Sequence, residues 1–353
     1  MHFDSDYMNL CHPAVLKRMA ETAPQTFSGY GTDPLTEAAR QQICRLCGCP
    51  QAKVFFLAGG TQTNMVMVDA LLRSFEGVLA ADSGHISIHE SGAIEFTGHK
   101  VLPLKPRDGK ISAQQVDDYV TAYYNDPNWE HIVPPGMVYI THPTEYGTLY
   151  TLEELEQLSA VCRRHRLPLY LDGARMGYGL AADTTDVALS DIARLCDAFY
   201  IGGTKCGTMY GEAVVFPDPQ RADRFFSHIK RHGALLAKGW AVALQFDALL
   251  RRADDHTAYA DDMADTLYYS ICRHAVAQAM RIRQALLQKG YTLYLDSPTN
   301  QQFATVTLQQ ADRLAQHLTY GQWEPPQGDR ITIRFATSWA TDTHDVDRLI
   351  ELL

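Results

Sequence analysis

A lysine follows an apolar run in the segment CDAFYIGGTKCGTMYGEAVVF, residues 196–216. The run ends in Gly202-Gly203-Thr204, and small residues continue beyond Lys205. Apolar surroundings lower the pKa of a lysine, and the neutral amine is the form that attacks a carbonyl carbon. The alternative is a surface lysine whose stem lies along apolar residues while its charge stays in water.

Two other stretches carry groups that could act together with Lys205, an acid and a glycine-rich turn. Asp172 ends the apolar run LPLYLD, and the turn AGGTQTN, residues 58–64, joins an apolar run to a helical pattern. Backbone N–H groups at such a helix start bind phosphate, although many such turns are only structural. Asp172 either pairs with the neighbouring Arg175 or leaves that arginine free to face a substrate.

Taken together, the three groups match the anchors of pyridoxal 5′-phosphate. A lysine forms an imine with this cofactor, an acid keeps its pyridine nitrogen protonated, and a turn holds its phosphate. His85 follows the apolar run GVLAA and fits a group that stacks on the ring, while Thr204 offers a hydroxyl beside the lysine. The combination predicts a pyridoxal-phosphate site.

The segments that must position these groups alternate between apolar runs and amphipathic patterns. Capping boxes at Ser112 with Gln115 and at Thr151 with Glu154 predict the starts of two helices. The segment HISIH, residues 85–89, alternates between polar and apolar residues, which predicts a strand. Continuous apolar runs separated by helices predict a mostly parallel sheet covered on both faces. The runs expected as strands are 53–58, 77–81, 100–104, 137–143, 167–172 and 196–203.

The pattern changes near residue 250. A long amphipathic stretch from Asp262 to Lys289 ends at Gly290, and strand-like YTLYL, QQFATVTL and RITIRFATSW precede a terminal helix from about Thr343. We therefore expect an α/β protein with three parts. These are an N-terminal segment (1–20) that contributes to the site, a large cofactor-binding domain (21–250) and a small C-terminal α+β domain (251–353).

Composition narrows the function classes. The net charge of −10 argues against nucleic-acid and anionic-membrane partners, and no 18-residue apolar run is present. Eight cysteines are too few for a disulfide scaffold, and the first residues do not resemble a secretory signal, so we expect a cytoplasmic location. Cys44, Cys47 and Cys49 resemble half a zinc site, but no second pair follows, which favours core packing. We expect no metal site.

The pieces also match a known family in order. They are FDSDYMN, GYGTDPLTEAARQQI, FLAGGTQTN, HISIHESGA, THPTEYGTLYTLEEL, YLDGARMG, GGTKCGTMYGEAVVF and IRFATSWATDTHDVDRLI. Together these pieces cover nearly the whole chain. The chain resembles the threonine aldolase and β-eliminating lyase family of fold-type I pyridoxal-phosphate enzymes, and within that family it resembles the low-specificity L-threonine aldolases.

The resemblance implies a role for each matching position. Lys205 is the cofactor lysine, Asp172 the partner of the pyridine nitrogen, and His85 both the ring-stacking group and the expected base. The remaining implied positions are Gly60, Thr61, Gln62 and Thr204 for the phosphate, Ser5, Arg175 and Arg334 for the substrate carboxylate, and Tyr30 and Glu90 for the pocket. The histidine that follows a strand in many relatives has no secure match in THPTEYGT, so His142 is not expected to act as a base.

The function implied is retro-aldol cleavage of L-threonine, L-allo-threonine and related β-hydroxy-α-amino acids to glycine and an aldehyde. The alternatives are a β-eliminating lyase that acts on another L-amino acid and a catalytically silent binding protein with the same fold. Relatives of this fold usually build the site across a subunit interface, so the resemblance also implies a homodimer or homotetramer.

Overall fold

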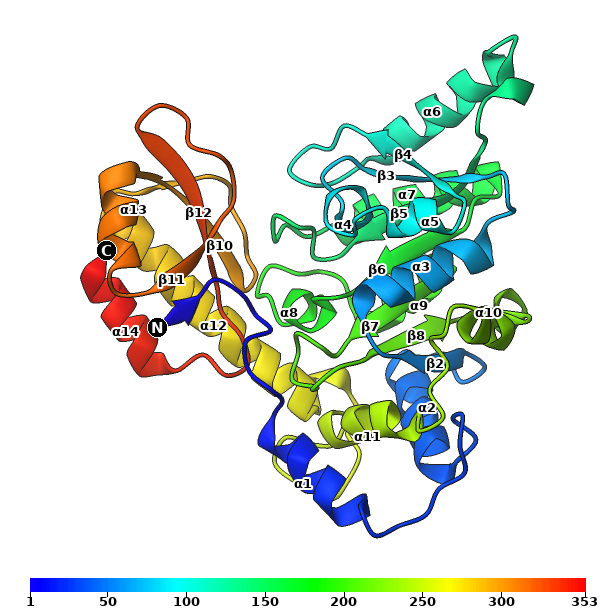
Figure 1. The fold of residues 1–353 in the computed structure, drawn as a ribbon, viewed down its shortest axis with the longest axis horizontal. Helices are drawn as coiled ribbons and strands as arrows, with labels where there is room; N and C mark the ends of the chain where they lie inside the picture. The colour runs from blue at the N-terminus through cyan, green and yellow to red at the C-terminus, as the bar shows by residue number, and fades with distance from the viewer.

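The computed structural model describes residues 1–353, which form two sheets flanked by helices (Figure 1). A seven-stranded sheet has the order β2-β8-β7-β6-β5-β3-β4, and a five-stranded sheet has the order β1-β11-β12-β10-β9. The α/β class and the mostly parallel large sheet expected from the sequence are confirmed.

The strands of the large sheet coincide closely with the apolar runs. They are β2 (Lys53–Leu57), β3 (Gly77–Ala81), β4 (Lys100–Leu104), β5 (Pro135–Thr141), β6 (Leu169–Asp172), β7 (Ala198–Gly202) and β8 (Glu212–Phe216). Neighbours from β4 through β3, β5 and β6 to β7 are parallel, whereas β8 is antiparallel to both β7 and β2.

Helices cover both faces of this sheet. Along β3, Val78 and Ala80 belong to one apolar cluster and Leu79 and Ala81 to the other, so both faces of the strand are buried. The first face packs against α3 (Gly60–Leu71), α4 (His85–Ile88), α5 (Ala93–Phe96) and α10 (Phe225–Arg231). The second packs against α2 (Pro34–Leu46), α6 (Ala113–Asn125), α7 (Leu152–His165), α9 (Leu189–Leu195) and α11 (Trp240–Leu249). Both predicted capping boxes form, at Ser112 and at Thr151.

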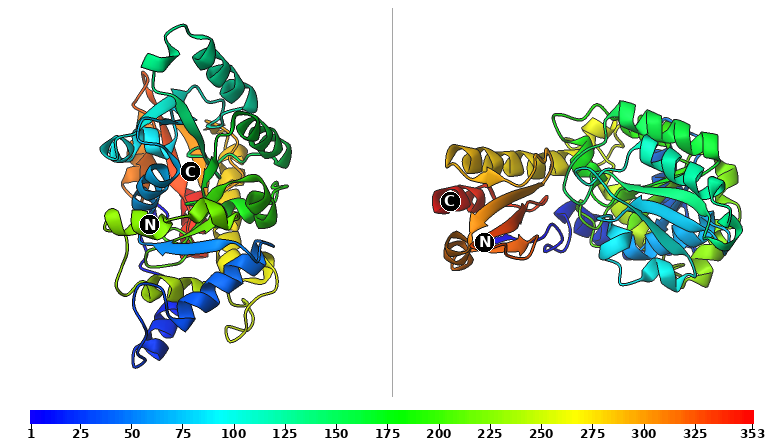
Figure 2. Two further views of the ribbon diagram at one scale, coloured as in Figure 1. Left: turned by 90° about the vertical axis from the view of Figure 1, so that its right-hand side faces the viewer. Right: turned by 90° about the horizontal axis from the view of Figure 1, so that it is seen from above.

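The small sheet contains the chain's first and last strands. Its members are β1 (His2–Phe3), β9 (Thr292–Leu293), β10 (Gln301–Thr307), β11 (Thr319–Gln322) and β12 (Arg330–Ala336). Helices α13 (Leu308–Ala315) and α14 (Thr343–Leu352) pack on it with part of α12 (Leu267–Gln288). Figure 2 shows α12 running from this sheet toward the large one, where it contacts α8 (Met176–Leu180).

The N-terminal segment crosses between the two sheets. Strand β1 pairs with β11 in the small sheet, whereas α1 (Pro13–Thr22) packs against α11 beside the large one. In Figure 1 this blue segment passes from the small sheet to the bottom of the large domain. Residues 4–12 therefore lie where the two sheets face each other.

Three local predictions were wrong. The segment HISIH forms the short helix α4, with His89 N–H donating to His85 O; Ile86 is buried and Ile88 exposed, whereas a strand would place both on one face. Helix α12 begins at Leu267, after a 3₁₀ turn at Met263–Asp265, because Thr266 caps its first turn. The strand expected in YTLYL shortens to Thr292–Leu293.

No helix is both long and apolar enough to cross a bilayer.

Candidate active site

Asp172 ends β6 at the carboxyl edge of the large sheet and is almost fully buried. Its Oδ1 accepts hydrogen bonds from Ala174 N (2.9 Å) and Tyr200 Oη, and its Oδ2 from Tyr139 Oη (2.7 Å) and Asn64 Nδ2 (2.9 Å). Burial alone would raise the pKa of Asp172, but the charge of His85 and these hydrogen bonds outweigh it and lower the pKa. Asp172 is therefore a permanent buried anion.

Asn64 connects this anion to His85. It lies one turn into α3, and its Nδ2 donates to Asp172 and to Glu90 Oε1 (2.7 Å), while Tyr170 Oη donates to its Oδ1 (2.9 Å). Glu90 Oε1 also lies 2.7 Å from His85 Nδ1. Burial opposes a charge on His85, but the hydrogen bond with Glu90 and the charges of Glu145 and Asp172 raise its pKa. For Glu90, an acid, burial has the opposite effect and raises the pKa of its carboxyl.

A cavity of about 490 Å³ opens beside this network, between the two sheets. Four of the predicted site residues line it, namely Lys205, His85, Arg175 and Arg334. They come from the loop after β7, from α4, from the loop after β6 and from β12. The other lining residues are Tyr7, Ile88, His89, Glu145, Tyr146, Gln322, Trp323 and Glu324. The cavity thus combines cations from both domains with aromatic walls.

Lys205 sits in a tight loop that leaves little room for side chains. A Cβ on Gly203 would meet Gly211 O at 2.5 Å, so only glycine fits there. Thr204 Oγ1 accepts from Gly211 N (3.1 Å) and donates to Glu212 Oε1 (2.7 Å), so its hydroxyl hydrogen is directed at Glu212. Glu212 is buried, and burial raises the pKa of its carboxyl to about 7.

Arg175 does not pair with Asp172. Its Nε and Nη2 donate to Asp6 Oδ2 (2.7 Å) and Oδ1 (3.0 Å), and both side chains are buried. Asn300 Nδ2 donates to the same Asp6 Oδ2 at 3.0 Å. Arg175 Nη1 is left facing the cavity, 4.0 Å from Glu145 Oε2.

Arg334 reaches the cavity from the small sheet and has no carboxylate within ion-pair distance. Its Nη1 donates to Gln301 Oε1 (3.0 Å) and its Nη2 to Asp4 O (2.8 Å), while its buried Nε has no partner. Its guanidinium lies 5.5 Å from the centre of the Trp323 ring. Burial and the charge of Arg175 lower the pKa of Arg334, so an anionic ligand is the partner this group lacks.

The start of α3 leaves polar groups without partners. Gly60, Thr61 and Gln62 form its first turn, where backbone N–H groups have no carbonyl of the helix to bond. Gln62 Oε1 is buried without a partner, and a Cβ on Gly60 would lie 3.3 Å from Tyr200 Oη. This turn therefore lies directly beside the Asp172 network.

These features fit pyridoxal phosphate. The ionised Asp172 suits a protonated ring nitrogen, the open helix start suits a phosphate, and Lys205 points to the same cavity. Oxygen and nitrogen atoms that are buried without partners, such as Ser5 Oγ and Arg334 Nε, indicate that a polar ligand completes the site.

Tyr30 and His142 are also not among the residues that line the cavity. Tyr30 is 45 % exposed, adopts a left-handed backbone (φ 59°), and lies under Lys230, whose Nζ is 5.1 Å from the ring centre. His142 is fully buried, its Nδ1 accepts from Tyr150 N, and burial lowers its pKa to about 4.

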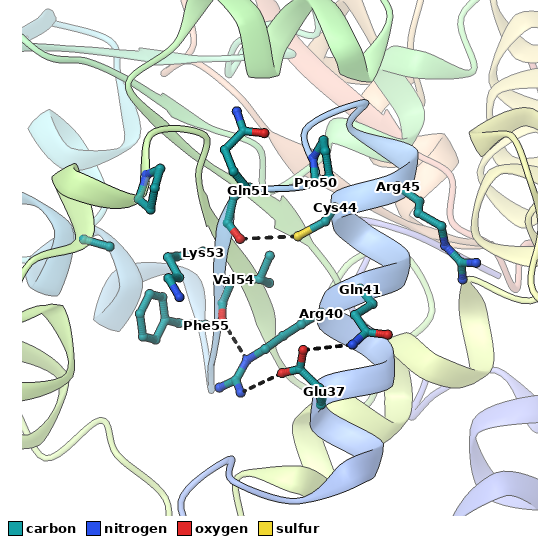
Figure 3. A pocket seen from close by; sticks show the side chains of 13 residues that line it. Glu37, Arg40, Gln41, Cys44, Arg45, Pro50, Gln51, Lys53, Val54 and Phe55 are labelled. Carbon is teal, nitrogen blue, oxygen red and sulfur yellow. Dashed lines mark hydrogen bonds and ion pairs between the residues drawn. The ribbon is translucent and has the colours of Figure 1, made fainter.

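A hollow of about 800 Å³ lies elsewhere, between α2 and β2, and no predicted site residue lines it (Figure 3). Cys44 Sγ in its wall donates to Ala52 O at 3.4 Å, and Cys49 Sγ donates to Pro217 O at 3.5 Å. Burial raises the pKa of Cys44, Cys47 and Cys49, so the thiols stay protonated and pack in the core, as predicted. No cluster of His, Cys, Asp or Glu in the structure is arranged to hold a metal ion.

Several residues of the site were not singled out from the sequence. The segments that match the family, GGTQTN, FDSDYMN and THPTEYGT, include Asn64, Asp6 and Glu145 respectively. No role was predicted for these three residues. Asn64 was open to prediction, because it lies one helical turn after Gly60 and so faces the same edge of the sheet. Nothing in the local pattern indicates the contacts of Asp6 or Glu145.

Comparison with known proteins agrees with this geometry. A sequence model of the family described as "Beta-eliminating lyase" matches residues 2–347. The chain is 33% identical over 261 residues to a low specificity L-threonine aldolase of Pseudomonas aeruginosa, covering 71% of this chain and 74% of that protein. A second aldolase of that description, from a Pseudomonas species, is 30% identical over 275 residues, which is 75% of this chain and 76% of that protein. The solved structure of a Leishmania major threonine aldolase superimposes with a TM-score of 0.92 at 36% identity, over 99% of this chain and 98% of that one.

Proposed function

The chain belongs to the β-eliminating lyase family, and on that premise we propose that it is a pyridoxal-phosphate-dependent aldehyde-lyase. It cleaves L-threonine, L-allo-threonine and related β-hydroxy-α-amino acids to glycine and an aldehyde. The observation that carries the proposal is the cavity in which Lys205, His85 and two arginines meet beside the buried anion Asp172. The similarity to three threonine aldolases supports the reaction type.

The chain's own residues account for binding of the cofactor. Lys205 would bond it covalently, Asp172 would hold its ring nitrogen protonated, and the first turn of α3 would take its phosphate. His85, kept in place by Glu90, would lie against the ring. When bound, the cofactor supplies the electron sink that accepts the pair released from the Cα–Cβ bond.

The substrate carboxylate has a natural partner in Arg334. This arginine is largely buried, faces the cavity and binds only neutral oxygens, so a carboxylate would supply its missing charge. Arg175 directs its remaining Nη1 to the same space. A carboxylate bound there would lie in the same cavity that Lys205 lines.

The direct test is to incubate the purified protein with pyridoxal phosphate and L-threonine. We expect glycine and acetaldehyde in equal amounts, whereas β-elimination would release ammonia and 2-oxobutanoate. Lys205→Ala should lose the visible absorbance of the bound cofactor and at least a thousandfold of the activity. A Lys205→Ala variant that is folded and cleaves threonine at the wild-type rate would refute the proposal.

We also propose that the protein forms at least a homodimer and is cytoplasmic. Tyr30, expected in the pocket but exposed in the single chain, would complete the cavity of a second copy. Exposed apolar side chains on neighbouring elements, Ile88, Phe96 and Phe226, support a subunit contact. All eight cysteines are free, which suits a reducing compartment. Light scattering of the purified protein measures its subunit number.

A further inference from the structure

Glu145 is the one acid that lines the cavity deep beside Arg175 and has no hydrogen-bond donor of its own. Its side chain is only 11% exposed, and no side chain or backbone N–H of the protein donates to its carboxylate. The nearest cationic atom, Arg175 Nη1, is 4.0 Å away, and that arginine is already paired with Asp6. The Glu145 carboxylate, which lines the cavity and accepts no hydrogen bond from the protein, is therefore open to a donor on a bound ligand.

The backbone of the turn that carries Glu145 is held in place by contacts from both domains. The turn from Thr144 to Thr148 is closed by Thr144 N to Thr148 O (2.9 Å) and by Gly147 N to Thr144 O (2.8 Å). Ser297 and Thr299, from the segment leading to the small sheet, donate to Gly147 O at 3.2 and 3.1 Å. Gly147 has φ +72°, and a Cβ there would meet Ser297 Oγ at 2.3 Å. Both domains therefore fix the turn.

The other acids and imidazoles at the cavity are less suited to accept a proton. Glu90 engages His85 Nδ1, and this hydrogen bond with the charges of Glu145 and Asp172 raises the pKa of His85, which favours the protonated imidazole that cannot accept a further proton. Glu324 accepts from Tyr294 Oη at 2.6 Å, and His89 is exposed at the mouth of the cavity. His142, one possible strand-end histidine, is fully buried and does not line the cavity. Glu145 alone combines a cavity position, a fixed backbone and an open acceptor.

We propose that Glu145 is the general base of the reaction, in place of His85, and that it binds the β-hydroxyl of the substrate. This inference rests on the function proposed above. Glu145 accepts the hydroxyl proton while the O–H electron pair becomes the second bond of the aldehyde carbonyl, and pyridoxal phosphate, when bound, would supply the sink for the electron pair of the broken Cα–Cβ bond. One proton is then delivered to Cα, so the reaction transfers one proton from oxygen to carbon and needs no further reactant.

The test compares two reactions of the holoenzyme that differ only in the need for this base. Retro-aldol cleavage of L-threonine requires removal of the hydroxyl proton, whereas exchange of the glycine Cα hydrogen in D₂O does not. The variants are Glu145→Gln and Glu145→Ala, with Glu156→Gln as a matched control on an exposed carboxylate of α7. Cofactor affinity, a readout independent of turnover, is measured by quenching of tryptophan fluorescence, since Trp323 lines the cavity.

We expect both Glu145 variants to lose about 10²- to 10⁴-fold in threonine cleavage. Glycine exchange and cofactor affinity should stay within about threefold of wild type, as should all three readouts in Glu156→Gln. Cleavage within about threefold of wild type in both Glu145 variants would overturn the inference while leaving the proposed function intact. An equal fall in exchange and cleavage, or lost cofactor affinity, would also overturn it. Wild-type protein that releases no glycine would refute the proposed function itself.

Discussion

The buried pair between Asp6 and Arg175 is open to a quantitative test through Asp6→Asn. Asp6 Oδ2 accepts from Arg175 Nε and Asn300 Nδ2, and Oδ1 accepts from Arg175 Nη2. An asparagine keeps one acceptor oxygen, so in either orientation its amide nitrogen faces a donor of Arg175. The substitution removes both the charge and one hydrogen bond.

The magnitude follows from burial. Removing one partner of a buried ion pair costs about 3–5 kcal/mol, because the other charge is left without compensation. Glu145, 4.0 Å from Arg175 Nη1, supplies part of that compensation, so we expect the lower end, about 3 kcal/mol. At roughly 2 °C per kcal/mol for a large domain, the melting temperature should fall by about 6 °C.

The assay is thermal unfolding of the wild type and of Asp6→Asn, both saturated with cofactor, since a bound ligand itself raises the melting temperature. Glu156→Gln is the control, because Glu156 pairs with Arg194 at 3.0 Å while both side chains are about half exposed. Such a pair contributes less than about 1 kcal/mol. A fall of about 1 °C or less in Asp6→Asn, equal to the control, would refute the reasoning.

The same pair has a defined pH dependence. Arg175 and Lys205 outweigh burial and hold the pKa of Asp6 far below its ordinary value. A carboxyl with a depressed folded-state pKa contributes stability that is full above its unfolded pKa, about 3.9, and is lost as the pH falls toward the folded value. The difference between wild type and Asp6→Asn should be constant from pH 8 to about pH 5 and shrink below about pH 4.

Two more predictions concern the neighbouring acids. In Glu90→Gln, the hydrogen bond that raises the pKa of His85 is weakened, so the imidazole should titrate at lower pH by NMR of its ring protons; an unchanged midpoint would contradict this. The Glu212 carboxyl has a pKa raised by burial to about 7 from 4.5, so wild-type stability should fall as the pH rises between these values. The melting temperature of Glu212→Gln should therefore lie closer to that of the wild type at pH 8 than at pH 5. An equal difference at both pH values would contradict the raised pKa of Glu212.

The strands of the large sheet were predictable because each is a continuous apolar run between polar helices. Residues 77–81 and 100–104 coincide with β3 and β4; β3 is buried along its whole length, which permits no polar side chain facing solvent, and β4 lies beside it at the edge of the sheet. The direction of β8 and β2 was not predictable, because an apolar pattern is the same read either way. The segment 85–89 was misread because five alternating residues fit both a short helix and a strand.

The site was predictable where chemistry is local. Lys205 and Asp172 each follow an apolar run, and parallel strands bring their carboxyl ends to one edge. The pairing of Asp6 with Arg175 and Asn300 was not predictable, since it joins segments 169 and 294 residues apart. Glu145 was equally hidden, because its lack of a partner is a property of the packed structure and leaves no mark in the sequence around it.

The pairing of β1 with β11 has a consequence for how the protein is made. His2 lies opposite Thr319, which is 317 residues further along the chain, and Asp4 O binds Arg334. Strand β1 must therefore wait, unpaired, until β11 (Thr319–Gln322) has been synthesised. Because domains generally fold as they emerge, the large sheet can form while the cavity still lacks its small-domain wall. Substrate binding is thus postponed until β12 has been synthesised, because Arg334, the proposed partner of the substrate carboxylate, lies in that strand.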